Sequence, residues 1–231
     1  MKTFGHRGWP QRYAENSIEG MIAAVNAGAH GIELDVRLSS DNQCVVFHDD
    51  NTLRMTGKDI ALSSLRLDQL SELSIDSPSN SHSAKIPTLA EVIAALPTDT
   101  PLNIELKTLP AYLVEELASQ LTGLLDNSQQ RNVLLSSFDL AIIEKAYQEL
   151  PYIPRAIAFE ADDLVDIATL RALACNTASL HYSLISSTLI NALKDEGISS
   201  TVWTVNSQTQ YDYCKQLGVD SVISDCLIGI T

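Results

Sequence analysis

Residues 31–36 read GIELDV, and residues 102–107 repeat the pattern as LNIELK. Side chains alternate between the two faces of a β-strand, so Ile32 and Leu34 share one face while Glu33 and Asp35 share the other. A strand of an α/β barrel is buried on both faces, against the helices on one side and against the barrel interior on the other. The first segment is therefore expected to direct its two carboxylates into the interior.

The second segment follows the same parity and directs Asn103, Glu105 and Lys107 to the interior. An edge strand with its charged face in water is the alternative interpretation of either segment alone, but two matching segments in an apolar chain favour burial. Buried carboxylates must be paired, hydrated or bound to a cation. Three carboxylates without a nearby cysteine suit a hard divalent cation, Mg²⁺ or Ca²⁺, rather than structural zinc.

Short β-type runs alternate with amphipathic helical segments along the rest of the chain, which is typical of βα units and a parallel sheet. Nine strands are predicted, at residues 2–5, 31–36, 44–48, 102–106, 132–136, 153–158, 178–181, 200–204 and 220–224. Seven helices are predicted, at residues 17–27, 88–96, 110–125, 140–150, 162–174, 187–196 and 208–217. Asn16 and Glu19 form a capping-box pattern at the first helix. We predict an α/β protein, a TIM (β/α)₈ barrel in a single domain spanning residues 1–231.

The nine predicted strands are one more than such a barrel needs. Only seven residues separate Val36 from Cys44, too few for a helical crossover, so a hairpin with its turn near Asp41 is expected. That turn places His48 level with Asp35. Residues 50–86, including the serine-rich SIDSPSNSHSAK, are predicted to be a small insertion after the His48–Asp49 segment, without enough apolar content for a core of its own.

Five histidines are present, and three of them, His6, His48 and His181, lie at the carboxyl ends of predicted strands. This is the face on which α/β barrels carry their active sites. A hydrogen-bonded structural role explains His6 or His48 alone equally well, but two histidines and three acids on one rim favour acid–base chemistry. His30 and His82 lie in predicted loops and are expected to be solvated.

The composition excludes several classes of protein. A net charge of −14 disfavours binding to nucleic acid or to anionic membranes, and no apolar stretch approaches the length of a membrane span. The N-terminal MKTFGHRG lacks the apolar region of a secretory signal. The four scattered cysteines have no metal-binding spacing and suit a reducing compartment. A cytoplasmic protein is therefore expected.

The motifs HRG, ENS, IELDV, VVFHD, NIELK, SSF, WTVN and GVDSVISD follow one another from residue 4 to about residue 225. In this order and spacing the chain resembles the glycerophosphodiester phosphodiesterase family. The resemblance implies a TIM barrel with an insertion after the HD motif. The chain departs from the family pattern at two places. Ala14 stands where proline often precedes the EN pair, and SDCL lacks the proline that commonly follows the aspartate.

The resemblance also implies roles for individual residues. His6 and His48 correspond to the catalytic acid and base of the family, and Arg7 and Lys107 to positions near the phosphate. His181 and Trp203 correspond to positions that line the substrate pocket. The metal ligands implied are Glu33, Asp35 and Glu105, with Mg²⁺ or Ca²⁺ as the cofactor. Glu15 and Asn16 correspond to the ENS motif, although a helix cap explains Asn16 equally well.

The implied reaction is hydrolysis of a small-molecule glycerophosphodiester to sn-glycerol 3-phosphate and an alcohol. The family suggests that the glycerol 2-hydroxyl attacks first, giving a cyclic phosphate that water then opens. Three alternatives remain: a barrel phosphodiesterase acting on lysophospholipids or inositol phosphodiesters, a noncatalytic phosphate-ligand binding protein, and a metal-dependent aldolase. A phosphodiesterase of the lysophospholipid or inositol type needs an apolar rim. A binding protein does not need paired histidines, and an aldolase has no evident use for paired histidines.

Overall fold

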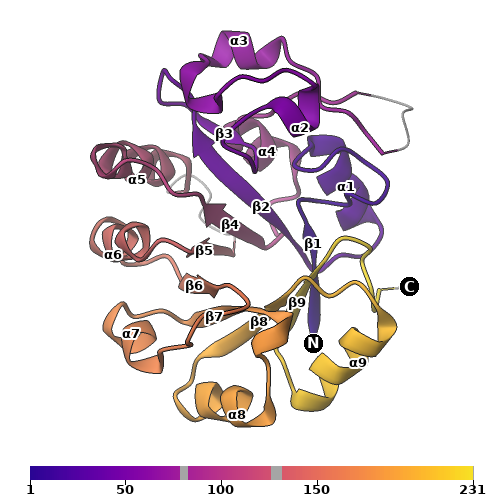
Figure 1. Cartoon of the computed structure of the whole chain (residues 1–231), viewed down its shortest axis with the longest axis vertical. Coiled ribbons are helices and arrows are strands. Elements are labelled where there is room, and N and C mark those ends of the chain that lie inside the picture. Colours follow the sequence, from indigo (N-terminus) through magenta and orange to yellow (C-terminus); the bar gives the residue numbers. More distant parts are fainter. Residues whose placement is uncertain (79–82, 126–131, 231) are drawn as a thin grey trace.

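The computed structural model describes residues 1–78, 83–125 and 132–230. Eight parallel strands form its centre: β1 (Lys2–His6), β2 (Gly31–Leu38), β4 (Leu102–Leu106), β5 (Val133–Ser137), β6 (Arg155–Phe159), β7 (Thr177–His181), β8 (Ser199–Trp203) and β9 (Ser221–Ser224). Pairing runs from β2 through β4 to β9, and β1 pairs with both β9 and β2, which closes the barrel. The helices surround the strands (Figure 1). The predicted TIM barrel is confirmed.

The barrel helices agree with the prediction at most of their ends: α1 (Ile18–Asn26), α4 (Leu89–Ala95), α5 (Ala111–Leu125), α6 (Leu140–Glu149), α7 (Ile167–Ala172), α8 (Ser187–Asp195) and α9 (Gln208–Leu217). The exception is α7, which begins five residues later than predicted because the Asp166 side chain accepts from the Ala168 N–H and caps the helix there. None of the helices within the described ranges is long and apolar enough to cross a bilayer.

The predicted cap of α1 is wrong. Ser17 is the N-cap residue, and its hydroxyl accepts from the Gly20 N–H at 3.1 Å. Asn16 has a left-handed backbone with φ of 56°. Its side chain donates to the Asp35 carboxylate at 2.8 Å and accepts from the Asp35 N–H at 3.3 Å. The Asn16 side chain therefore binds Asp35 on β2 and does not cap α1.

The extra strand is β3 (Cys44–Val46), which pairs antiparallel with β2 as the hairpin prediction requires. The turn forms at the expected place, since the Ser39 N–H donates to the Gln43 carbonyl and Asn42 has φ of 58°. The strand ends two residues before the predicted limit. The Phe47 N–H donates to the Asp35 carbonyl at 3.0 Å, so His48 follows directly beside the acidic strand.

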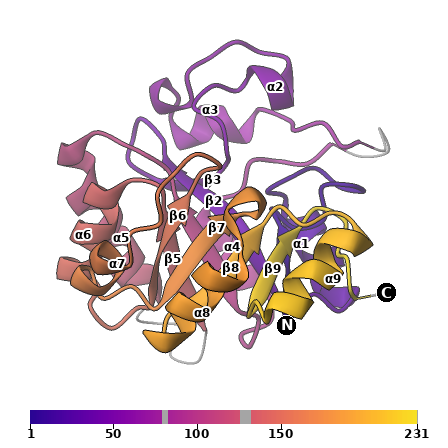
Figure 2. The same cartoon turned by 60° about the horizontal axis from the view of Figure 1, so that its bottom comes forward.

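The insertion carries α2 (Leu53–Thr56), the 3-10 helix η1 (Leu62–Ser64) and α3 (Leu67–Ser71). Figure 2 shows α2 and α3 beyond the β2–β3 hairpin, away from the body of the barrel. The buried apolar residues of the insertion form one small cluster with Ala14, Val45 and Phe47 of the barrel. The residues that the insertion contributes are Leu62, Leu70, Leu73, Ile75, Ala84 and Ile86. His82 lies outside the described residues. The insertion thus needs barrel residues to complete its apolar cluster.

Gly8 determines how the chain leaves β1 after His6 and Arg7. Its φ is +90°, and a Cβ there would lie 2.7 Å from the Gly20 carbonyl carbon and 2.8 Å from the Met21 nitrogen. We expect Gly8→Ala to lower the free energy of unfolding by about 2 kcal/mol or more, from backbone strain and the clash with α1. Thermal unfolding followed by circular dichroism measures this as a lower Tm.

Gly123→Ala is the matched control for that change. Gly123 lies within α5, and a Cβ there meets nothing within 4 Å. Replacing a glycine in a helix by alanine is expected to stabilise the protein by about 0.5–1 kcal/mol. An unchanged Tm in Gly8→Ala would contradict the close packing of the β1–α1 turn.

Candidate active site

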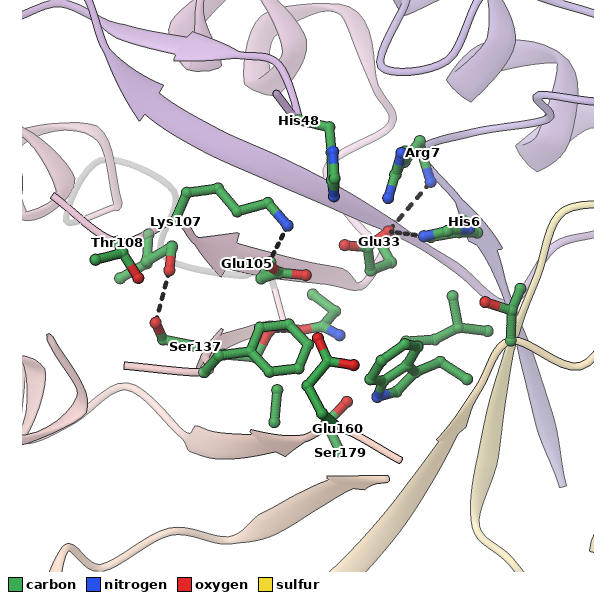
Figure 3. A pocket seen from close by; sticks show the side chains of 18 residues that line it. His6, Arg7, Glu33, His48, Glu105, Lys107, Thr108, Ser137, Glu160 and Ser179 are labelled. Carbon is green, nitrogen blue, oxygen red and sulfur yellow. Dashed lines mark hydrogen bonds and ion pairs between the residues drawn. The ribbon is translucent and has the colours of Figure 1, made fainter. Parts of the chain in front are cut away.

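A cavity of about 280 Å³ lies within the barrel, and every barrel strand contributes at least one residue to its lining. Both His6 and His48 line it, together with Arg7, Glu33 and Lys107 (Figure 3). These residues come from the end of β1, from β2, from the segment after β3 and from the segment after β4. Parallel strands place their carboxyl ends at one edge, so residues more than a hundred positions apart meet in one cavity.

The three predicted carboxylates form a compact cluster. One oxygen from each of Glu33, Asp35 and Glu105 lies within 4.8 Å of the other two. Asp35 and Glu105 are register partners on β2 and β4, which explains their proximity. Burial, followed by the nearby negative charge of Asp35, raises the pKa of Glu33 to about 8. The same two causes raise the pKa of Glu105.

The cluster fits a bound divalent cation on its own geometry. The Oε1 atom of Glu33 is buried and has no hydrogen-bond partner. Burial and mutual repulsion raise the pKa of both glutamates, so the ionised forms lack sufficient positive charge around them. Three carboxylate oxygens are the donor set preferred by Mg²⁺ and Ca²⁺. A cation in this position would supply the missing charge.

Two basic side chains converge on Asp35. Arg7 Nε lies 3.1 Å from Asp35 Oδ2, and Lys107 Nζ lies 2.8 Å from Asp35 Oδ1. Lys107 also forms an ion pair with Glu105. Burial alone would raise the pKa of Asp35, but Arg7 and Lys107 more than offset it and hold that pKa below its usual range. Asp35 is thus the most firmly ionised of the three acids.

Each cavity histidine is held by a carboxylate through its Nδ1 atom. His6 Nδ1 lies 2.6 Å from Asp225, and His48 Nδ1 lies 2.6 Å from Asp49. Burial lowers the pKa of His6, but the Asp225 hydrogen bond and the charge of Glu33 outweigh it and raise the pKa overall. Burial lowers the pKa of His48. The Nε2 atom of His6 lies 3.8 Å from Glu33.

An ion-pair chain links the insertion to the cavity. Arg54, in α2, contacts Asp49 at 2.7 Å and Glu15 at 2.6 Å. Glu15 in turn contacts Arg7 at 3.0 Å. The insertion therefore contributes a positive charge that orients both the partner of His48 and the partner of Arg7.

Trp203 lines the cavity, whereas His181 is not among its lining residues. The His181 ring packs edge-on against Trp203 with centroids 5.1 Å apart, and its Nδ1 atom lies 2.8 Å from the Ser183 hydroxyl. Phe138 packs edge-on against the same indole with centroids 5.5 Å apart. His181 therefore touches the indole that forms the wall of the cavity. His30 is exposed and accepts from the Thr3 N–H at 3.1 Å.

Several residues of the site were not assigned a part in it from the sequence. Asp225 contacts His6, and Asn16 contacts Asp35. Phe138 and Glu160 line the cavity. A usable signal exists for Asp225 and Glu160, since each directly follows a strand, β9 and β6 respectively. No comparable signal exists for Arg54, because the sequence of the insertion does not show how it folds back onto the barrel.

Comparisons with known proteins show which family this chain belongs to. The model of the glycerophosphoryl diester phosphodiesterase family matches residues 6–227. The chain is 30% identical to YhdW of Bacillus subtilis (strain 168), over 97% of this chain and 94% of that protein. It is 29% identical to a glycerophosphodiester phosphodiesterase of Caldanaerobacter subterraneus subsp. tengcongensis, over 97% of this chain and 95% of that enzyme.

Among solved structures, a phosphodiesterase of Oleispira antarctica in complex with the product sn-glycerol-3-phosphate superposes with a TM-score of 0.90. The two chains are 27% identical, and the likeness covers 100% of this chain and 95% of that one. The range matched by the family model, residues 6–227, spans every residue of the cavity described above. This chain belongs to the glycerophosphoryl diester phosphodiesterase family.

Proposed function

We propose that this protein hydrolyses glycerophosphodiesters to sn-glycerol 3-phosphate and the free alcohol. One observation carries the proposal: His6 and His48 face the same cavity as the carboxylate cluster and the cations Arg7 and Lys107. A noncatalytic binding protein needs no such pair of histidines. The product in the Oleispira antarctica structure, sn-glycerol-3-phosphate, is the one this reaction releases.

Glu33, Asp35 and Glu105 would hold the divalent cation, Mg²⁺ or Ca²⁺. When bound, that ion would supply positive charge against the nonbridging oxygens of the phosphodiester, whose charge grows in the transition state. Arg7 and Lys107 add two fixed positive charges at the same end of the cavity. With the cation bound, these groups would override the net charge of −14 at the point where the anionic substrate enters.

His6 and His48 carry the proton transfers. One imidazole removes a proton from the attacking hydroxyl, and the other protonates the leaving alkoxide. Asp225 and Asp49 hold their Nδ1 atoms at 2.6 Å, so in each ring Nε2 is the nitrogen left for the substrate. We infer that the glycerol 2-hydroxyl is the first attacking group and that water opens the resulting cyclic phosphate. Trp203 would form a wall against the glycerol carbons, with His181 supporting the indole.

A panel of diesters tests the substrate class. We expect release of sn-glycerol 3-phosphate from glycerophosphocholine or glycerophosphoethanolamine when Mg²⁺ or Ca²⁺ is present, measured with glycerol-3-phosphate dehydrogenase as the coupling enzyme. Glycerophosphoinositol completes the panel in the same assay, and lysophosphatidylcholine is followed by the choline it releases, because its other product keeps the acyl chain. Absence of product from every diester with either metal would contradict the proposal.

Lysophospholipids are a second candidate because exposed leucines lie in connections that follow the strand ends. Leu53, Leu140 and Leu164 are 51%, 48% and 88% exposed, and they follow β3, β5 and β6. The serine-rich sequence of the insertion indicated no such apolar rim. Faster turnover of lysophosphatidylcholine than of glycerophosphocholine would favour this candidate.

A further inference from the structure

Asp225 contacts His6 although it is not among the cavity-lining residues. The sheet register brings the two together: Gly5 of β1 is the partner of Ser224 of β9, and each is followed by one member of the pair. The distance between His6 Nδ1 and Asp225 Oδ1 is 2.6 Å. The contact is therefore built into the seam that closes the barrel.

Asn206, which follows β8, holds the other side of the Asp225 carboxylate. Its Nδ2 donates to Asp225 Oδ2 at 2.6 Å, and its Oδ1 accepts from the Asp225 N–H at 2.9 Å. The same Oδ1 accepts from the Ser224 hydroxyl at 3.3 Å. Turning the amide over would oppose its NH₂ to the Asp225 N–H and its oxygen to the carboxylate. The orientation of Asn206 is thus fixed by its own contacts.

An ionised carboxylate only accepts hydrogen bonds, so His6 Nδ1 must carry the hydrogen of this contact whether the ring is neutral or charged. The exchangeable position is then Nε2, which lies 3.8 Å from Glu33 in the cavity. A neutral imidazole in the opposite tautomer would carry its hydrogen on Nε2 and would be unable to accept a proton there. The carboxylate therefore selects the form of His6 that the proposed reaction needs.

We propose that Asp225, oriented by Asn206, is the positioning residue that holds His6 with Nδ1 protonated and Nε2 directed at the substrate. This inference rests on the proposed function, in which His6 transfers a proton. His48 has a parallel arrangement, in which Asp49 accepts at Nδ1 and is held by Arg54.

The variant Asp225→Asn opposes the required tautomer in either amide orientation. If the nitrogen of the new amide faces His6, the His6 Nδ1 atom has to accept a hydrogen bond and so loses its hydrogen. If the oxygen of the new amide faces His6, its NH₂ group faces the NH₂ group of Asn206. We expect kcat to fall by roughly 10²–10⁴-fold with KM little changed, since the loss affects proton transfer and not binding.

The double variant Asp225→Asn with Asn206→Asp is designed to restore the tautomer. The carboxylate at position 206 accepts from the new amide NH₂, which turns the amide oxygen toward His6 Nδ1. We expect kcat to recover by at least about tenfold over the single variant, because the wrong tautomer accounts for most of its loss. A role based only on packing predicts no such recovery, and a role based only on negative charge near the ring predicts recovery of kcat without return of the hydrogen bond at Nδ1.

Proton NMR of the substrate-free protein gives a second readout. A strongly downfield-shifted Nδ1–H resonance of His6 is expected in the wild type and in the double variant, and it should be lost in Asp225→Asn. Asp220→Asn is the control, because it removes one charge at the opposite end of β9, where Asp220 accepts from the Ser200 N–H. This control is expected to keep both the resonance and kcat.

Three results would overturn the inference: near-normal kcat in Asp225→Asn, a double variant no better than the single one, or a downfield resonance that survives Asp225→Asn. Failure of the proposed function looks different, since the wild type itself would release no sn-glycerol 3-phosphate. In that event the resonance alone decides whether Asp225 positions His6.

Discussion

His6→Ala and His48→Ala are each expected to lower kcat by roughly 10²–10⁴-fold, the contribution usual for a positioned acid or base. Both imidazoles line the cavity beside the carboxylate cluster, and each is fixed through Nδ1 by a carboxylate at 2.6 Å. Removing either ring takes away one of the two proton transfers on which the proposed reaction depends. The measurement is steady-state release of sn-glycerol 3-phosphate.

Folding has to be monitored beside activity in these variants. Neither histidine belongs to the apolar clusters of the core, so the Tm of both variants should stay close to that of the wild type. His30→Ala is the matched control, because His30 is an exposed histidine that accepts from the Thr3 N–H outside the cavity. Full activity in His6→Ala or in His48→Ala would refute the two-histidine scheme.

Chelation is expected to abolish turnover, and Mg²⁺ or Ca²⁺ is expected to restore it. The oxygens of Glu33, Asp35 and Glu105 lie within 4.8 Å of one another, and burial with mutual repulsion raises the pKa of both glutamates. A divalent cation relieves that repulsion and binds only the folded arrangement. At 100 times its Kd it would stabilise the fold by about 2.7 kcal/mol, which appears as a higher Tm.

Glu33→Gln separates the metal effect from other effects of a chelator. The variant removes one ligand charge while keeping the size of the side chain, so it should lose most of the metal-induced rise in Tm together with turnover. Glu160→Gln changes a cavity carboxylate outside the cluster and should keep that rise in Tm. Hydrolysis that persists in EDTA would count against a cation at these three residues.

The local features of the site were predictable because strand periodicity is a property of a few consecutive residues. Alternation within GIELDV and LNIELK sent Glu33, Asp35 and Glu105 to the interior, and the structure places all three there. The short return from Val36 to Cys44 required a hairpin for a similarly local reason, since seven residues cannot make a crossover. The family motifs then supplied a set of candidate roles.

Helix caps were less predictable because a polar side chain near a helix start has competing partners. Asn16 has the residue type of a cap, yet it bonds to Asp35 on β2, and Ser17 caps α1 instead. Only the packing of α1 against the barrel decides between these partners. His181 ends a strand as predicted, but its ring packs against Trp203 and is not among the cavity-lining residues.

The amino-acid sequence by itself determined the βα repeat, the inward carboxylates and the strand-end positions of His6 and His48. The tertiary structure alone decided which groups hold those histidines: Asp225, which is 219 positions from His6, and Asp49 with Arg54 from the insertion. The physical reason is that the first features depend on a few consecutive residues, whereas the contacts to the histidines depend on how distant parts of the chain pack. Alternation follows from the geometry of one strand, whereas a partner across the barrel seam follows from the register of β1 on β9, which closure of the whole sheet sets.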